Sequence, residues 1–185
     1  MAPEVDLVAR LASAQIGETF NQYAGSALRR ERLRLYLAAR ADAAVVLVGE
    51  AAGYRGARVS GVPFTSERQL TGSGLAEASA TIVHRVLARL GIEEDVLLWN
   101  VVPTHPGTES SNRVPRRDEV EAAAPFLDEV LRGRAVIAVG RVAEAATGAS
   151  YVRPPARGGA AAFEEGLERA FATICRRRAC VRPFL

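Results

Sequence analysis

Four short apolar runs constrain the fold more than any other feature of this sequence. They are AVVLVG at residues 44–49, DVLLWN at 95–100, AVIAVG at 135–140 and a weaker SYVR at 150–153. The three stronger runs show no alternation of polar and apolar residues, which is typical of β-strands covered on both faces. We therefore expect four strands, most of them buried.

Segments with apolar residues at helical spacing surround these runs. They cover residues 3–10, 27–40, 73–90, 116–131, 141–147 and 160–178. Strands that alternate with helices form a parallel sheet with helices on both faces. The sequence therefore predicts an α/β protein with a three-layer α/β/α architecture and a four-stranded parallel sheet. No repeat or low-complexity linker divides residues 1–185, so we expect a single domain.

The composition limits where the chain works and what it binds. Hydrophobic residues make up 49% of it, and the mean hydropathy is +0.04. No apolar run approaches the roughly 18 residues that cross a bilayer, and the first residues show no export signal. We expect a cytoplasmic monomer that does not enter a membrane. Cys175 and Cys180 are too few for a four-thiolate cluster or zinc site, so we expect no metal.

All 24 basic residues are arginines, the net charge is +3, and the pI is about 9.3. Guanidinium groups suit bidentate contacts with phosphate and stacking on bases. A mild basic excess permits nucleic-acid binding without requiring it, since a solvated surface also explains scattered arginines.

The loops that follow the predicted strands gather the polar and glycine-rich segments. In parallel α/β sheets, ligands bind beyond the carboxyl ends of the strands, where these loops meet. The first loop, GEAAGYRG, lacks the glycine spacing of a dinucleotide site and the lysine of a nucleoside-triphosphate loop. A small nucleotide-binding protein thus stays as an alternative with little support.

Five residues near this edge carry candidate chemistry, and each has a structural alternative. The Asn100 amide offers donors and an acceptor in one plane, as reading a nucleobase edge requires, or it satisfies its own loop. Phe64 is either one wall of a flat slot or a plug for the core. Glu50 either orients water or pairs with an arginine. For His105, a role in the site and a structural role in its loop are both open. The pattern around His84 favours a helix-surface or core residue.

Together these segments resemble the uracil-DNA glycosylase superfamily, and most closely its bacterial branch with a GEAPG first motif. The resemblance covers about residues 45–167. The segments that carry it are VGEAAG at 48–53, SGVPF at 60–64, WNVVPTHP at 99–106 with NRVPRRDE at 112–119, and RPPARGGAAAF at 153–163.

The resemblance implies removal of uracil or a related deaminated base from DNA by hydrolysis of the glycosidic bond, with no cofactor. Asn100 would select uracil, Phe64 would stack on the flipped base, and Glu50 would act beside Gly49 and Ala51 to shape the pocket and hold water. His105 is a further catalytic candidate. The phosphate contacts would come from rim arginines, namely Arg55, Arg58, Arg113, Arg153 and Arg157.

Two positions depart from the family pattern in ways that affect catalysis. Ala51 stands where the most active members carry a water-activating aspartate, and Pro154 stands where a histidine usually donates to the uracil oxygen. Loss of one such donor costs about 2.7–4 kcal/mol of transition-state stabilisation. Arg153, Arg157 or His105 would have to replace it. The alternative is a protein with a glycosylase fold that binds damaged or single-stranded DNA without cleaving it.

Overall fold

The computed structural model describes residues 3–178, with side chains described for residues 7–176. Strands and helices alternate along the chain, and α3 and α4 are short additions between β1 and α5. The elements are α1 (Pro3–Ser13), α2 (Ala27–Ala39), β1 (Val45–Ala51), α3 (Ala57–Ser60), α4 (Glu67–Thr71), α5 (Ala78–Leu90), β2 (Val96–Val102), α6 (Arg117–Leu131), β3 (Ala135–Val139), α7 (Arg141–Thr147), β4 (Ser150–Val152) and α8 (Ala160–Arg178).

The four strands form one parallel sheet in the order β2-β1-β3-β4. Each parallel connection runs through at least one helix, as the geometry of parallel strands requires. The central strand β1 pairs with β2 so that Val45 lies opposite Val96 and Gly49 lies opposite Asn100. The predicted α/β fold with a four-stranded parallel sheet is confirmed.

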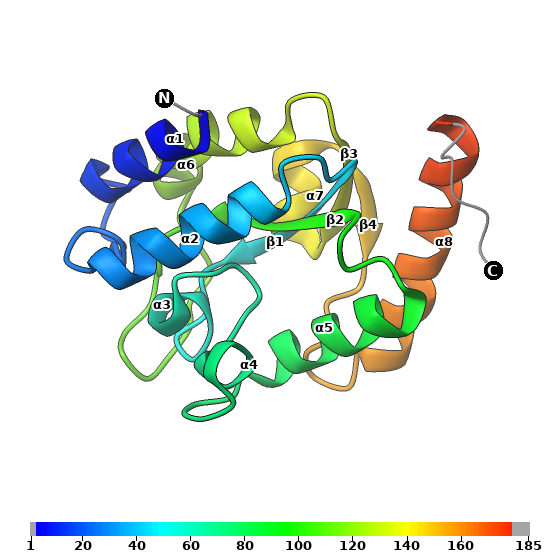
Figure 1. Cartoon of the computed structure of the whole chain (residues 1–185), viewed down its shortest axis with the longest axis horizontal. Coiled ribbons are helices and arrows are strands. Elements are labelled where there is room, and N and C mark those ends of the chain that lie inside the picture. Colours follow the sequence, from blue (N-terminus) through cyan, green and yellow to red (C-terminus); the bar gives the residue numbers. More distant parts are fainter. Residues whose placement is uncertain (1–2, 179–185) are drawn as a thin grey trace.

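Alternate residues of the strands enter two hydrophobic cores, one on each face of the sheet. Val46 and Val48 of β1 pack with residues of α1, α2, α6 and α7 in one core. Val45 and Leu47 pack with residues of α5 and α8 in the other. Figure 1 shows the first group of helices above the sheet and α5 and α8 on its other side. Both faces are covered, which explains why the strand sequences do not alternate.

The predicted helix at residues 73–90 begins later than expected. In the structure α5 starts at Ala78, and residues 72–77 form a loop. Gly72 and Gly74 adopt left-handed backbone conformations with φ of 75° and 81°, which end α4 and prevent an earlier start of α5. This later start places Glu77 at the end of a loop rather than in a helix.

Strands β1 and β2 each run two residues further than their apolar cores suggest. Glu50 and Ala51 belong to β1, and Asn100 lies inside β2, which continues to Val102. Asn100 therefore lies within the ladder between β2 and β1, opposite Gly49, rather than at a strand end. Over residues 3–178, no helix is long and apolar enough to cross a bilayer.

Candidate active site at the carboxyl ends of the strands

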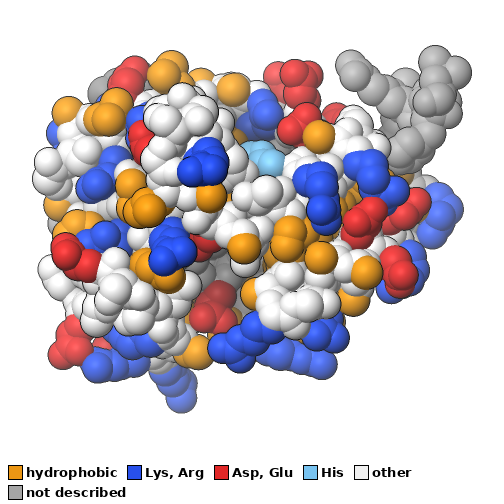
Figure 2. All heavy atoms as spheres, turned by 90° about the horizontal axis from the view of Figure 1, so that it is seen from below, with side chains coloured by type: hydrophobic (Ala, Val, Ile, Leu, Met, Phe, Trp, Pro, Cys, Tyr) orange, Lys and Arg blue, Asp and Glu red, His pale blue; other side chains and the backbone are white. Residues whose placement is uncertain are grey.

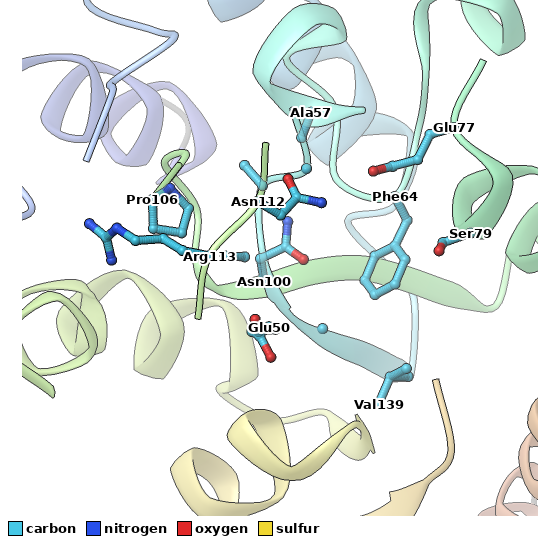
Figure 3. Close-up of a pocket in the computed structure, with 14 residues that line it drawn as sticks. Glu50, Ala57, Phe64, Glu77, Ser79, Asn100, Pro106, Asn112, Arg113 and Val139 are labelled. Atoms are coloured by element: carbon cyan, nitrogen blue, oxygen red, sulfur yellow. The ribbon is translucent and has the colours of Figure 1, made fainter. Parts of the chain in front are cut away.

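A cavity of about 180 Å³ opens where β1 and β2 end. Its wall combines the ends of β1, β2 and β3 with the loops after β1 and β2 and the start of α5 (Figure 3). The lining residues are Gly49, Glu50, Ala51, Ala52, Gly53, Ala57, Phe64, Glu77, Ser79, Asn100, Pro106, Asn112, Arg113 and Val139. Six candidates from the sequence thus meet in one wall, namely Gly49, Glu50, Ala51, Phe64, Asn100 and Arg113.

The cavity floor is formed by two residues that lie side by side on the adjacent strands β1 and β2. Asn100 is only 4% exposed, and its amide lies beside Gly49 on β1. A β-carbon at Gly49 would come within 2.9 Å of Asn100 Oδ1 and 2.8 Å of Phe64 Cε2. Only glycine leaves room for the amide and the ring together. The polar amide is therefore available to a ligand at the bottom of an otherwise close-packed floor.

Phe64 forms an aromatic side of the cavity and has an uncommon backbone. Its φ is +52°, in the left-handed region that residues with a side chain rarely adopt. Such conformations cost of order 1–3 kcal/mol and persist only where the surroundings hold them. The ring is turned toward the floor beside Asn100 (Figure 3).

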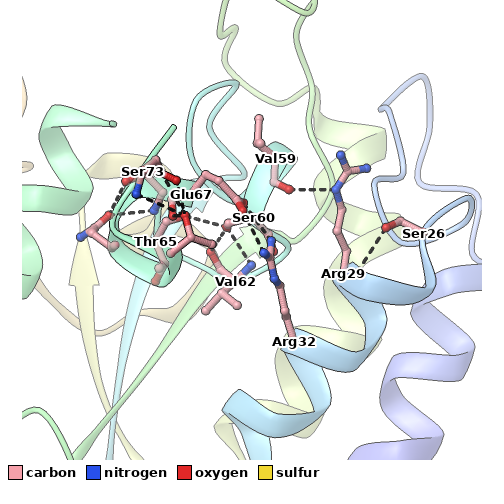
Figure 4. A network of polar contacts seen from close by, with 12 residues as sticks. Ser26, Arg29, Arg32, Val59, Ser60, Val62, Thr65, Glu67 and Ser73 are labelled. Atoms are coloured by element: carbon pink, nitrogen blue, oxygen red, sulfur yellow. Dashed lines mark hydrogen bonds and ion pairs between the residues drawn. The ribbon is translucent and has the colours of Figure 1, made fainter. Parts of the chain in front are cut away.

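A network of polar contacts holds the Phe64 loop against α2 (Figure 4). Ser60 Oγ donates to the carbonyl of Thr65 at 2.6 Å and accepts from the Val62 amide at 3.0 Å, so it closes the turn on both sides of Phe64. From α2, Arg29 Nε donates to the Val59 carbonyl at 2.9 Å, and Arg32 forms two 2.8 Å contacts with Glu67. The loop is fixed to a helix of the opposite layer.

His84 also supports this loop. Its Nε2 lies 3.1 Å from Thr65 Oγ1, the residue after Phe64. Burial lowers the pKa of His84, which favours the neutral ring. It lies outside the cavity wall, in agreement with the prediction of a helix or core residue.

Two carboxyl groups line the cavity, and only Glu50 was among the sequence candidates. Burial raises the pKa of Glu50 and, separately, that of Glu77. Figure 3 shows them on opposite sides of Asn100. Glu77 was missed because residues 73–90 read as one helix, which hid its position at the helix start. The glycines at 72 and 74 were the signal that could have revealed it.

Asn112 links the two loops that flank the cavity, and it too was missed as a site residue. Its Oδ1 accepts a hydrogen bond from the Tyr54 amide at 2.9 Å. The remaining amide NH₂ lies on the cavity side in Figure 3. Asn112 therefore adds a second side-chain amide to the wall, from a different loop than Asn100.

His105 lies behind the wall rather than in it. Its side chain is fully buried, and Nδ1 and Nε2 lie 2.7 Å from the carbonyl oxygens of Ala52 and Thr108. Its backbone also pairs in both directions with Phe20. The residue ties three segments together, and neither ring nitrogen is directed at the cavity.

The comparison with known proteins identifies this arrangement. A family model for the uracil DNA glycosylase superfamily matches residues 37–174, a span that contains every residue of the cavity wall. The chain belongs to the uracil-DNA glycosylase superfamily. The resemblance drawn from the sequence motifs is therefore confirmed at the level of the superfamily.

Two individual proteins illustrate the relationship. The type-4 uracil-DNA glycosylase of Pyrobaculum aerophilum is 34% identical over 102 residues, which cover 53% of this chain and 44% of that protein. The match thus spans less than half of that relative's length. The crystal structure of SMUG2 from Pedobacter heparinus aligns with a TM-score of 0.69 over 95% of this chain and all of that chain, at 12% identity. That likeness supports the fold.

The rim arginines of this superfamily member differ in how free they are. Arg113 gives both terminal nitrogens to the fully buried Glu119, at 2.7 and 2.5 Å, so its guanidinium points away from the cavity floor. Arg58 pairs with Glu109 at 2.9 Å and lies over the Phe20 ring. No described ion pair involves Arg55, Arg153 or Arg157.

The charges on the face that Figure 2 shows are mixed. This view from below shows arginines scattered among acidic and apolar side chains rather than one continuous basic patch. Of the five candidate arginines, Arg113 alone is among the described residues that line the cavity.

The two departures from the superfamily pattern are visible in the cavity. Ala51 lines the wall without a carboxylate, and none of the described residues of the loop after β4, where Pro154 lies, reaches the wall. Among the described residues, no group of three or more histidine, cysteine, aspartate or glutamate side chains could hold a metal ion. Cys180 lies outside the described residues.

Proposed function

We propose that this chain is a DNA glycosylase that hydrolyses the N-glycosidic bond of uracil or a related deaminated base in DNA, and that it acts as a monomer without a cofactor. One observation carries the proposal: a buried amide, Asn100, lies on the cavity floor beside an aromatic ring, Phe64, in a chain of this superfamily. A flat base with a polar edge requires an amide that hydrogen-bonds to that edge and an aromatic ring that stacks on its face.

The target nucleotide must leave the base stack to reach this floor, at a cost of a few kcal/mol. In the pocket, the base would stack on Phe64 and place its edge against Asn100. When the glycosidic bond breaks, its electron pair leaves with the base and the sugar becomes positive. The Asn100 amide would donate to the base where negative charge develops, and such preorganised donors supply a large part of catalysis. Glu50 would help to shape the pocket at the edge of the floor.

The cavity supports a slower enzyme than the family's most active members. Ala51 and Pro154 stand where the most active members carry an aspartate and a histidine, so both side chains are missing at these positions. Each missing group is expected to lower the rate by about a hundredfold or more. These same absences motivate the second candidate, a protein that binds damaged DNA without cleaving it.

The test uses single- and double-stranded oligonucleotides with one uracil, incubated with excess protein and then treated with hot alkali to cut abasic sites. Protein from cells that lack their own uracil-DNA glycosylase avoids contaminating activity. We expect cleavage at uracil and not at thymine, and Asn100→Ala should lower the rate at least about a hundredfold. Salt-sensitive DNA binding without any cleavage would favour the second candidate.

Pro154→His tests the cause of a slow rate. If the absent histidine limits catalysis, this variant should be at least about tenfold faster than the parent, because it restores one donor to the leaving base. Ala156→His is the matched control, since it places the same side chain at an exposed position of the same loop, two residues later. An equal gain in both variants would argue against a specific oxyanion contact.

A further inference from the structure

Glu77 occupies the cavity from an element that no motif of the family resemblance includes. It is the last residue before α5 and follows residues 71–76, all of which are exposed. It therefore lines the cavity from a loop, whereas Glu50 extends from β1. Figure 3 shows the Glu77 carboxyl directed toward the side of the cavity formed by Ala57 and Asn112.

The glycine turn after β1 is shaped around this carboxyl group. A β-carbon at Gly53 would lie 3.0 Å from Glu77 Cδ, and one at Gly56 would lie 2.9 Å from the same atom, with a carboxylate oxygen closer still in each case. The two oxygens fill the space that side chains at both positions would need. The spacing of glycines in GYRG thus has a physical reason: a carboxyl group lies against both of them.

This carboxyl group has no partner of its own. Among the described residues, no hydrogen bond or ion pair involves the carboxyl group of Glu77, whose backbone carbonyl alone accepts, from Thr81. Burial raises the pKa of this carboxyl group. A half-buried, uncompensated carboxylate is unfavourable for folding. Buried carboxyl groups with a raised pKa are common at functional sites, where the raised pKa suits acid–base chemistry.

The reaction needs a negative group beside the sugar. A base held between Phe64 and Asn100 would direct its sugar away from the floor, toward the loops that include Glu77, and the sugar is the part that becomes positive. Ala51 cannot supply a carboxylate. The chain therefore lacks a carboxylate at the usual position, and Glu77 lines the same cavity from a different loop.

We infer that Glu77 is a catalytic carboxylate of this pocket, which holds the attacking water and accepts its proton. The C1′–N bond breaks and its electron pair leaves with the base, while the water oxygen bonds to C1′ and one water proton passes to Glu77. The departing base takes a proton from solvent, and Glu77 later returns its proton to solvent. This inference rests on the proposed function.

The experiment compares single-turnover rates of the parent, Glu77→Gln and Glu94→Gln on uracil-containing single-stranded DNA. Glu94 is exposed and lies before β2, at the opposite end of the sheet, so it controls for the loss of one charge. We expect a loss of about a hundredfold or more in Glu77→Gln, the size of a general-base contribution, with no change in Glu94→Gln. A rate for Glu77→Gln within threefold of an active parent would overturn the inference. An inactive parent would overturn the proposed function instead.

A second variant separates chemistry from loop structure. Glu77→Ala leaves space for a small carboxylate, so added sodium formate should raise its rate roughly tenfold or more, while the parent and Asn100→Ala should not respond. A merely structural role of Glu77 predicts no formate response. Sodium chloride at the same ionic strength is the salt control, and an equal gain with it would also overturn the inference.

Discussion

The ring of Phe64 occupies the space that a side chain at Gly49 would fill. Gly49→Ala should therefore push the ring from its place and crowd the Asn100 amide. We expect a loss of at least about tenfold in single-turnover rate and about 1–3 kcal/mol in the free energy of unfolding, as for overpacked cores. Denaturant unfolding and the uracil assay measure the two effects.

Gly25→Ala is the matched control for this change. A β-carbon at Gly25 meets nothing within 4 Å, and its φ is not positive. Its stability and rate should stay within error of the parent. A normal rate in Gly49→Ala would mean that Phe64 is not held against β1 as described.

The ion pair between the partly exposed Arg113 and the buried Glu119 should matter for stability more than for DNA binding. Glu119 is fully buried, and its carboxylate also accepts a hydrogen bond from the Arg116 amide at 2.8 Å. Arg113→Ala leaves this carboxylate buried without its cation, so we expect a loss of about 3 kcal/mol in the free energy of unfolding. Arg117→Ala, which removes a 92% exposed partner of Glu121, should cost less than about 0.5 kcal/mol.

The stability that this ion pair contributes depends on pH, in a direction set by the shift of the Glu119 pKa. Arg113 lowers the pKa of Glu119 below its ordinary value, so the pair stabilises the fold above the ordinary carboxyl pKa. That contribution is lost as the pH falls through the lowered folded-state value. The stability difference between the parent and Arg113→Ala should therefore shrink in acid. A difference that stays constant down to strong acid would contradict the assignment.

His105 should prove structural. Its ring contacts two backbone carbonyls in a fully buried setting, so His105→Ala leaves both without that partner. We expect a loss of about 2–4 kcal/mol in stability, given about 1–3 kcal/mol for each unsatisfied buried group. Thermal unfolding measures it. A variant of parental stability that had lost activity would return His105 to the catalytic residues.

The ionised carboxylate of Glu50 should destabilise the folded protein. Burial raises its pKa in the folded state, so the folded protein binds this proton more readily than the unfolded chain. The resulting penalty grows as the pH rises through the ordinary and then the raised value, and it is complete above the latter. Glu50→Gln should therefore have a higher Tm than the parent near pH 8 and a similar Tm at pH 4. A lower Tm at both pH values would show that the carboxylate has a stabilising partner.

The strands and the cavity floor were predictable because their signals are local. Val45, Leu47 and their neighbours form uninterrupted apolar runs, and parallel topology then brings the residues after each run to one edge. Asn100 and Phe64 could be placed there from the sequence, although the left-handed backbone of Phe64 could not, since it depends on contacts from α2.

The remaining site residues depend on contacts between segments far apart in the chain. Glu77 and Asn112 reach the cavity from irregular loops, where no periodic pattern indicates the direction of a side chain. The buried partner of Arg113 lies six residues later in the next helix, and the carbonyls that hold His105 come from two different loops. The sequence shows which chemical groups these residues carry, but it does not show which residues they contact.

The position of Asn100 inside β2, and not after it, has a consequence for how this cavity can change. Its side chain direction is determined by the pairing of Gly49 with Asn100, and that register is fixed by the valines and leucines on both faces of the sheet. A shift by one residue would turn the amide to the other face and bury apolar side chains wrongly along the whole strand. The floor is therefore as immobile as the core, and new substrates would have to be accommodated by the three loops around it.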